Sequence, residues 1–149
     1  MKAWLRLARV PFAFTAATDA LAVGLLAHVA LGSDATTTRW AAVLGAAMLV
    51  YAFGMMLNDW ADRTEDALHA PDRPIPSGAL RPTAVAVAIL IVAAGALALG
   101  HLAGTLPAVG AALVLAALYD LGTKRSVIGG AAVLGLARAA NAAQVPLAA

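Results

Sequence analysis

Five long apolar runs dominate the sequence and restrict its fold more than any other feature. They cover residues 11–31, 40–57, 82–101, 105–119 and 127–147. Most approach the ~20 residues that a helix needs to cross a hydrocarbon core of about 30 Å, and the fourth is the shortest. Backbone groups cannot stay unpaired in lipid, and no run alternates as a barrel strand does. We therefore predict an all-α, polytopic transmembrane bundle with about five membrane helices.

The composition supports this fold and excludes several classes of protein. Hydrophobic residues make up 62% of the chain and charged residues only 12%, against about 25% charged residues in soluble domains. A net charge of +2 gives no reason to expect nucleic acid as a partner, and the absence of cysteine excludes disulfides and thiolate metal sites. We treat residues 1–149 as one partial transmembrane domain in a lipid bilayer.

The basic residues alternate between the two sides of the predicted bundle. From the N-terminus onward the segments outside the runs carry Lys2, Arg6 and Arg9, then Arg39, then Arg63, Arg73 and Arg81, then none, then Lys124 and Arg125. Positive charge favours the cytoplasmic side of a membrane. We expect an integral protein of a bacterial inner membrane, with the N-terminus, residues 58–81 and residues 120–126 in the cytoplasm.

An acidic motif closes the second apolar run. Asn58, Asp59, Asp62 and Asp66 follow the spacing N-D-x-x-D-x-x-x-D. On a helix that turns about 100° per residue, the three aspartates fall within roughly a 60° sector, where their charges repel each other. Mg²⁺ binds one or two carboxylates together with substrate phosphates. We predict that these four residues form a Mg²⁺–diphosphate site at the mouth of a membrane cavity; the alternative is a solvated acidic helix.

Two further segments on the same side carry cations. Arg73, in the segment DRPIPSG, offers forked donors to diphosphate oxygens. Lys124 follows Tyr119 and Asp120 at the end of the fourth run, where its ammonium group is placed to hold a leaving diphosphate. Asp120 precedes Lys124 by one helical turn, so the two side chains are within reach of each other on a helix. For both cations the alternative is a residue that only anchors the cytoplasmic side.

The first and fifth runs also contain charged side chains. Arg138 and Asn141 are three residues apart in the fifth run and share a helix face, and Asp19 lies in the first run. An ionisable group inside a membrane faces either a partner or a cavity. Two interpretations stay open: Arg138 pairs with Asp19, or Arg138 lines a polar cavity.

These segments resemble the UbiA superfamily of membrane prenyltransferases. The resemblance is carried by residues 58–66, 72–78, 119–124 and 135–141, and by the opening residues 9–24. It implies a Mg²⁺-dependent enzyme that transfers a prenyl group from an isoprenyl diphosphate to a membrane-soluble acceptor. The acceptor class stays open among aromatic or quinone precursors, tetrapyrroles and lipids.

The resemblance also implies roles for individual residues. Asp59, Asp62 and Lys124 are expected to be catalytic, and Mg²⁺ is expected to be held by the acidic motif. The residues expected to contact the diphosphate are Asn58, Arg73, Tyr119, Lys124 and Arg138.

The sequence departs from the family pattern in two ways. No acidic residue follows Asp120, so the family's second Asp-rich motif is absent, and the lysine lies one residue farther from Tyr119 than in many members. We expect the chain to be an inactive N-terminal portion of about half an enzyme. Alternatives are a non-enzymatic transporter or assembly fragment, and a CDP-alcohol phosphotransferase, whose pattern needs an Asp-Gly pair that does not precede Ala137-Arg138 here.

Overall fold

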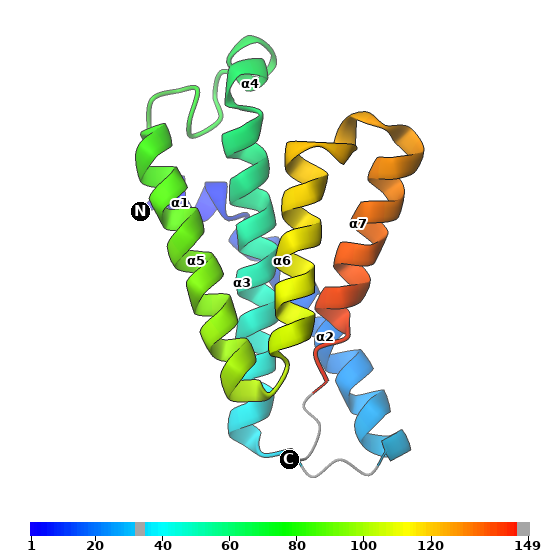
Figure 1. The fold of residues 1–149 in the computed structure, drawn as a ribbon. Coiled ribbons are helices and arrows are strands. Elements are labelled where there is room, and N and C mark those ends of the chain that lie inside the picture. Colours follow the sequence, from blue (N-terminus) through cyan, green and yellow to red (C-terminus); the bar gives the residue numbers. More distant parts are fainter. Residues whose placement is uncertain (32–34, 146–149) are drawn as a thin grey trace.

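The structure, a computed structural model, describes residues 1–31 and 35–145. Within that part the regular structure is helical throughout, which confirms the predicted fold class (Figure 1). The elements are α1 (Lys2–Leu7), α2 (Val10–Leu31), α3 (Thr37–Ala61), α4 (Arg63–His69), α5 (Pro82–Ala103), α6 (Leu106–Leu121), the 3₁₀ helix η1 (Thr123–Arg125) and α7 (Val127–Ala142).

The five predicted runs correspond to α2, α3, α5, α6 and α7. Among the described residues, three helices are long and apolar enough to cross a membrane: Val10–Ala30, Thr37–Ala61 and Pro82–Ala103. The helices α6 and α7 are also apolar but have 16 residues each, which gives about 24 Å at a rise of about 1.5 Å per residue. The fifth run ends earlier than predicted, because α7 stops at Ala142 and residues 146–147 lie outside the described part.

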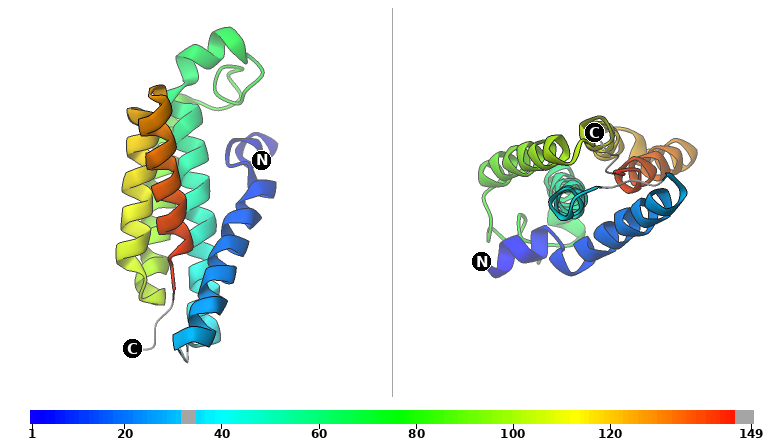
Figure 2. Two further views of the ribbon diagram at one scale, coloured as in Figure 1. Left: turned by 90° about the vertical axis from the view of Figure 1, so that its right-hand side faces the viewer. Right: turned by 90° about the horizontal axis from the view of Figure 1, so that it is seen from below.

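Helix α3 is the centre of the bundle. It packs against α2, α5 and α6, and the view along the bundle shows the other long helices arranged around it (Figure 2). Its buried positions are small in the first half of the helix (Ala42, Val43, Ala46, Ala47 and Val50) and larger toward its end (Phe53, Met56 and Leu57). Small side chains let helix backbones approach closely, which favours helix association in lipid.

The turn-rich segment between α4 and α5 folds back onto α3. Ile75 and Leu80 are buried in the same apolar cluster as Leu7 of α1 and Met56 of α3. The backbone of Arg73 accepts a hydrogen bond from the N–H of Ser77 at 3.0 Å. This packing fixes the segment beside the end of α3, where the acidic motif lies.

Candidate functional site

The acidic motif spans a junction between two helices. Helix α3 ends at Ala61, Asp62 has φ −87° and ψ 2°, and α4 begins at Arg63. The helical hydrogen bonds continue across the junction, with Asp62 N–H donating to Asn58 at 2.9 Å and Asp66 N–H donating to Asp62 at 2.8 Å. The carboxylates face two different partners: Asp59 and Asp66 pair with Arg73, whereas Asp62 pairs with Lys124.

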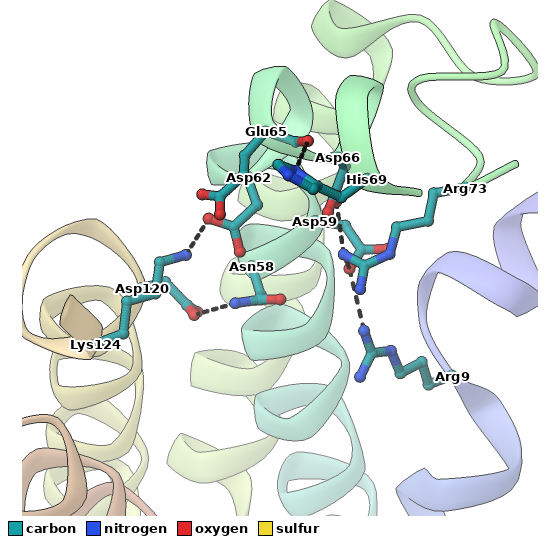
Figure 3. Close-up of polar contacts among 10 residues, drawn as sticks. All are labelled: Arg9, Asn58, Asp59, Asp62, Glu65, Asp66, His69, Arg73, Asp120 and Lys124. Atoms are coloured by element: carbon teal, nitrogen blue, oxygen red, sulfur yellow. Dashed lines mark hydrogen bonds and ion pairs between the residues drawn. The ribbon is translucent and has the colours of Figure 1, made fainter. Parts of the chain in front are cut away.

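The first group contains Asp59 and Asp66, which share Arg73. The Arg73 Nη1 atom lies 2.6 Å from Asp66 Oδ2 and 3.6 Å from Asp59 Oδ1. Arg9 also reaches Asp59, with 3.3 Å between Nη2 and Oδ1 (Figure 3). Asp59 is 4% exposed and Asp66 is 8% exposed. We name the four residues Arg9, Asp59, Asp66 and Arg73 the arginine group.

Arg9 was predicted only as a residue that sets topology. It lies where α1 gives way to α2, and its backbone has a positive φ of 45°, which is uncommon for a residue with a side chain. Its N–H donates to the carbonyl of Arg6, and its own carbonyl accepts from the N–H of Phe12. Nothing in the spacing of the sequence predicts this turn or the contact with Asp59.

Arg73 lies outside the membrane-spanning helices, and its charge is stabilised by this setting. Desolvation by burial lowers the pKa of Arg73. The hydrogen bond to Asp66 and the negative charges of Asp59, Asp66 and Asp62 outweigh that effect, so the pKa rises above its ordinary value. The guanidinium therefore stays a permanent cation beside the acidic motif.

The second group joins the α3–α4 junction to the end of α6. Lys124 Nζ lies 2.5 Å from Asp62 Oδ1, and Asn58 Nδ2 donates to Asp120 Oδ1 at 3.0 Å (Figure 3). Helix α6 ends at Leu121, so Lys124 lies in η1 rather than one turn after Asp120 on a continuous helix. Lys124 pairs with Asp62 at the α3–α4 junction and Asp120 accepts from Asn58 on α3, so the two side chains do not pair with each other. We name the four residues Asn58, Asp62, Asp120 and Lys124 the lysine group.

A pocket of about 290 Å³ opens at the lysine group. Its lining residues come from the α3–α4 junction and from the α6–η1 turn: Trp60, Ala61, Asp62, Arg63, Asp120, Leu121, Gly122, Lys124 and Arg125. Arg63 stacks on Trp60 with its guanidinium carbon 4.4 Å from the ring centroid. Three cations and two carboxylates therefore line one pocket, a composition that suits an anionic ligand bound together with a metal.

Neither Arg138 nor Tyr119, both predicted to contact the diphosphate, is among the residues that line this pocket. Tyr119 is half-buried and directly precedes the buried Asp120. Arg138 pairs with Asp19, with 3.2 Å between Nη2 and Oδ2, and both residues line a second cavity between α2, α3, α6 and α7. The interpretation that Arg138 pairs with Asp19 is therefore confirmed, and the cavity that Arg138 lines is mostly apolar rather than polar.

The oxygen ligands alone do not form a closed metal cage. Across residues 1–31 and 35–145, no three histidine or acidic side chains converge closely enough to hold a metal ion. Mg²⁺ commonly takes one or two carboxylates and completes its shell with water and phosphate oxygens. The two acidic groups suit that open mode of binding.

The sequence profile of the UbiA prenyltransferase family matches residues 14–148. The chain belongs to the UbiA prenyltransferase family. Members of this family are generally dependent on divalent metals, and their acceptors are lipid-soluble. Together with the apolar helices, membership identifies the chain as an integral membrane protein.

Two relatives within the UbiA family show what the chain is similar to. Digeranylgeranylglyceryl phosphate synthase of Halobacterium salinarum is 38% identical over 104 residues, which cover 67% of this chain and 36% of the relative. Chloroplastic chlorophyll synthase of Avena sativa is 48% identical over 46 residues, or 31% of this chain and 12% of the relative. The chain thus matches only about a third of the first relative's length.

A solved structure supports the fold. It comes from work on the biosynthesis of digeranylgeranylglyceryl phosphate synthase in membranes, and it has a TM-score of 0.85 with 22% sequence identity. The similarity covers 95% of this chain and 50% of that structure. At this identity the likeness establishes the arrangement of helices and nothing about the substrate.

Proposed function

We propose that this chain supplies the diphosphate-binding half of a Mg²⁺-dependent prenyltransferase. The reaction would transfer a prenyl group from an isoprenyl diphosphate to an acceptor within the membrane. The acceptor class stays open among aromatic or quinone precursors, tetrapyrroles and lipids. The observation that carries the proposal is the Asp62–Lys124 pair at the pocket, which joins residues 62 positions apart and places a carboxylate beside a cation. Family membership and the prenyltransferase relatives support it.

The donor atoms of both groups fit Mg²⁺. Asn58, Asp59, Asp62 and Asp66 offer only carboxylate and amide oxygens, the hard ligands that this ion prefers. When bound, Mg²⁺ supplies Lewis-acid neutralisation of the diphosphate charge. Three of these proposed ligands already accept hydrogen bonds from cations: Asp59 from Arg9, Asp66 from Arg73 and Asp62 from Lys124. The fourth, Asn58, directly precedes Asp59 in the chain.

The basic residues would bind the diphosphate directly. Lys124 has three N–H donors and donates one to Asp62, so two remain for phosphate oxygens. Arg73 has five donors and remains one-third exposed while it holds Asp66. As the carbon–oxygen bond to the prenyl group breaks, these fixed cations stabilise the diphosphate that leaves with the electron pair. The apolar helices exclude water from the prenyl cation.

Substitution of the acidic motif tests the proposal. We expect Asp59→Ala and Asp62→Ala each to abolish Mg²⁺-dependent prenyl transfer, because each removes a metal ligand and strands a cation. The assay uses the protein expressed from its complete reading frame, labelled prenyl diphosphates of several lengths, and acceptors from the three classes. Asp72→Ala is the matched control, because Asp72 is an exposed carboxylate in the same segment, paired only loosely with Arg6 at 3.7 Å. Unchanged transfer by either motif variant would refute the proposed site.

We expect the 149-residue chain to bind Mg²⁺–diphosphate without transferring a prenyl group. No acidic residue follows Asp120, so a second acidic cluster of the kind that the family resemblance implies is missing from these residues. We expect the chain in lipid nanodiscs to bind Mg²⁺–diphosphate, with Lys124→Ala weakening binding about tenfold or more, which corresponds to about 1.4 kcal/mol. We expect no prenyl transfer by the same preparation, and measurable turnover would contradict that part of the proposal.

A further inference from the structure

A second cavity lies deeper in the bundle than the diphosphate pocket. It has a volume of about 300 Å³, and its walls come from α2, α3, α6 and α7. Most of its lining is apolar and small, including Ala16, Gly54, Ala112 and Ala116. The last lining residues on α3 and α6 are Met55 and Ala116. They precede Asn58 and Asp120 of the lysine group by three and four residues, which is about 4.5–6 Å along a helix. The cavity therefore adjoins the place where the proposed reaction would occur.

One charged pair interrupts the apolar lining. Arg138 Nη2 lies 3.2 Å from Asp19 Oδ2, and the side chains remain 73% and 50% exposed. Arg138 lies about 17 Å along α7 from Val127, at a rise of about 1.5 Å per residue, which places it well inside a core of about 30 Å. Charged groups at that depth are costly unless polar groups meet them. The two charges meet each other, and a ligand that fills this cavity gains by bringing polar atoms to the donors and acceptors that the pair leaves over.

The wall that carries Arg138 is held in place by amides. Asn141 lines the cavity one turn after Ala137, and its Nδ2 atom donates to the carbonyl of Ala47 on α3 at 3.4 Å. Gln144 Nε2 donates to Asn141 Oδ1 at 2.7 Å. Because both the nitrogen and the oxygen of the Asn141 amide are already hydrogen-bonded within the protein, we assign this side chain to the wall of the cavity and not to ligand binding. Arg138 and Asp19 are the charged residues that line the cavity. Arg138 has further N–H donors and Asp19 has further acceptor sites that a ligand can use.

The chemistry of the pair selects among possible ligand groups. A hydrocarbon chain alone would leave the remaining donors of Arg138 and the remaining acceptor sites of Asp19 without partners in the cavity. A phosphate would gain from Arg138 but would be repelled by Asp19, which already balances the guanidinium. A neutral hydroxyl satisfies both, because its O–H donates to the carboxylate and its oxygen accepts from an N–H of the guanidinium.

We propose that the Asp19–Arg138 pair binds the neutral, hydroxyl-bearing head of the prenyl acceptor. This assignment rests on the proposed function for the identity of the bound molecule as an acceptor. It narrows the acceptor to an uncharged hydroxyl compound whose apolar part lies against α3 and α6. It also gives Asp19 a role in specificity, since its charge excludes anionic acceptors.

Photo-crosslinking tests the proposal without any reaction. The chain is placed in lipid nanodiscs with no Mg²⁺ and no diphosphate, and labelled with a 1-O-alkylglycerol that carries a diazirine beside its head group, or with the phosphate ester of that probe. We expect the neutral probe to label peptides of α3 and α7 about tenfold more than the ester. Asp19→Asn should reverse this preference, because it releases the Arg138 charge for the phosphate.

One variant controls for damage to the fold. Arg6→Gln breaks an exposed ion pair outside the cavity and should leave both labelling yields unchanged. Equal labelling by both probes in the unaltered chain, no labelling of α3 and α7, or an Asp19→Asn variant that does not gain labelling by the ester would overturn the assignment. Since no metal or diphosphate is present, this result is independent of the test of the acidic motif.

Discussion

At the scale of single residues, Arg73 is the side chain on which most of the acidic motif depends. One guanidinium serves two buried carboxylates, Asp59 and Asp66, that come from different helices. Removing one partner of such a pair leaves charge without compensation in a desolvated setting. Arg73 therefore has a structural role as well as a proposed role in binding.

We expect Arg73→Ala to lower the free energy of unfolding by about 1–3 kcal/mol. This is below the ~3–5 kcal/mol for breaking a fully buried pair, because Arg73 remains partly exposed. Arg6→Ala, which breaks an exposed pair, should cost about 1 kcal/mol or less. Unfolding of both variants by SDS titration in mixed micelles measures the difference. Equal losses would show that the arginine group does not stabilise the fold.

The chemistry of the site could be predicted from residue types, but its pairing could not. The spacing of Asp59, Asp62 and Asp66 predicts an acidic cluster, and Lys124 is predicted on the same side of the membrane. Asp59 and Asp66 pair with Arg73, and Asp62 pairs with Lys124. At about 100° per residue a helix already turns Asp62 about 40–60° away from the other two aspartates, but this periodicity does not say which cation lies on each side. The cations come from the segment before α5 and from η1, and their positions depend on tertiary packing.

At the scale of elements, the α5–α6 hairpin positions the lysine group. Gly104 ends α5 with φ 77°, a conformation that glycine adopts without strain. Gly100 then faces Val109 so closely that a Cβ atom on Gly100 would lie 2.7 Å from Val109 Cγ2. The apolar runs predict these two helices and their order, whereas their close approach depends on where glycines meet branched side chains.

We expect Gly100→Ala to destabilise the bundle by about 1–3 kcal/mol, since the added methyl group overpacks the α5–α6 contact. Gly110→Ala is the matched control on α6, because a Cβ atom there would meet nothing within 4 Å. The control should be neutral or slightly stabilising. Thermal unfolding in detergent, followed by circular dichroism, compares the two. A stable Gly100→Ala variant would show that α5 and α6 can separate at no cost.

At the scale of the whole molecule, the charged connections gather at one end of the bundle. The Asp62–Lys124 pair joins the α3–α4 junction to η1, and Trp60 Nε1 donates to the carbonyl of Pro82 at the start of α5. Since basic segments remain in the cytoplasm, we propose that this end is cytoplasmic in a bacterial inner membrane. The opposite end contains the turn between α5 and α6.

Cysteine labelling tests this orientation, and the chain contains no cysteine of its own. We introduce Ala79→Cys in the exposed segment before α5 and His101→Cys at the exposed end of α5. In intact bacterial cells, a membrane-impermeant maleimide should label position 101 and spare position 79 until the cells are opened. The reverse pattern would place the acidic motif outside the cytoplasm.

The two groups of charged residues are made at different times during synthesis, because they come from different stretches of the chain. Every member of the arginine group precedes α5, so these four side chains can come together once residues 1–81 are made. The lysine group needs Asp120 and Lys124, and therefore waits until α5 and α6 have entered the bilayer. Because domains form from the N-terminus while synthesis proceeds, we expect Asp59 and Asp66 to be neutralised by arginine before the pocket beside Asp62 exists.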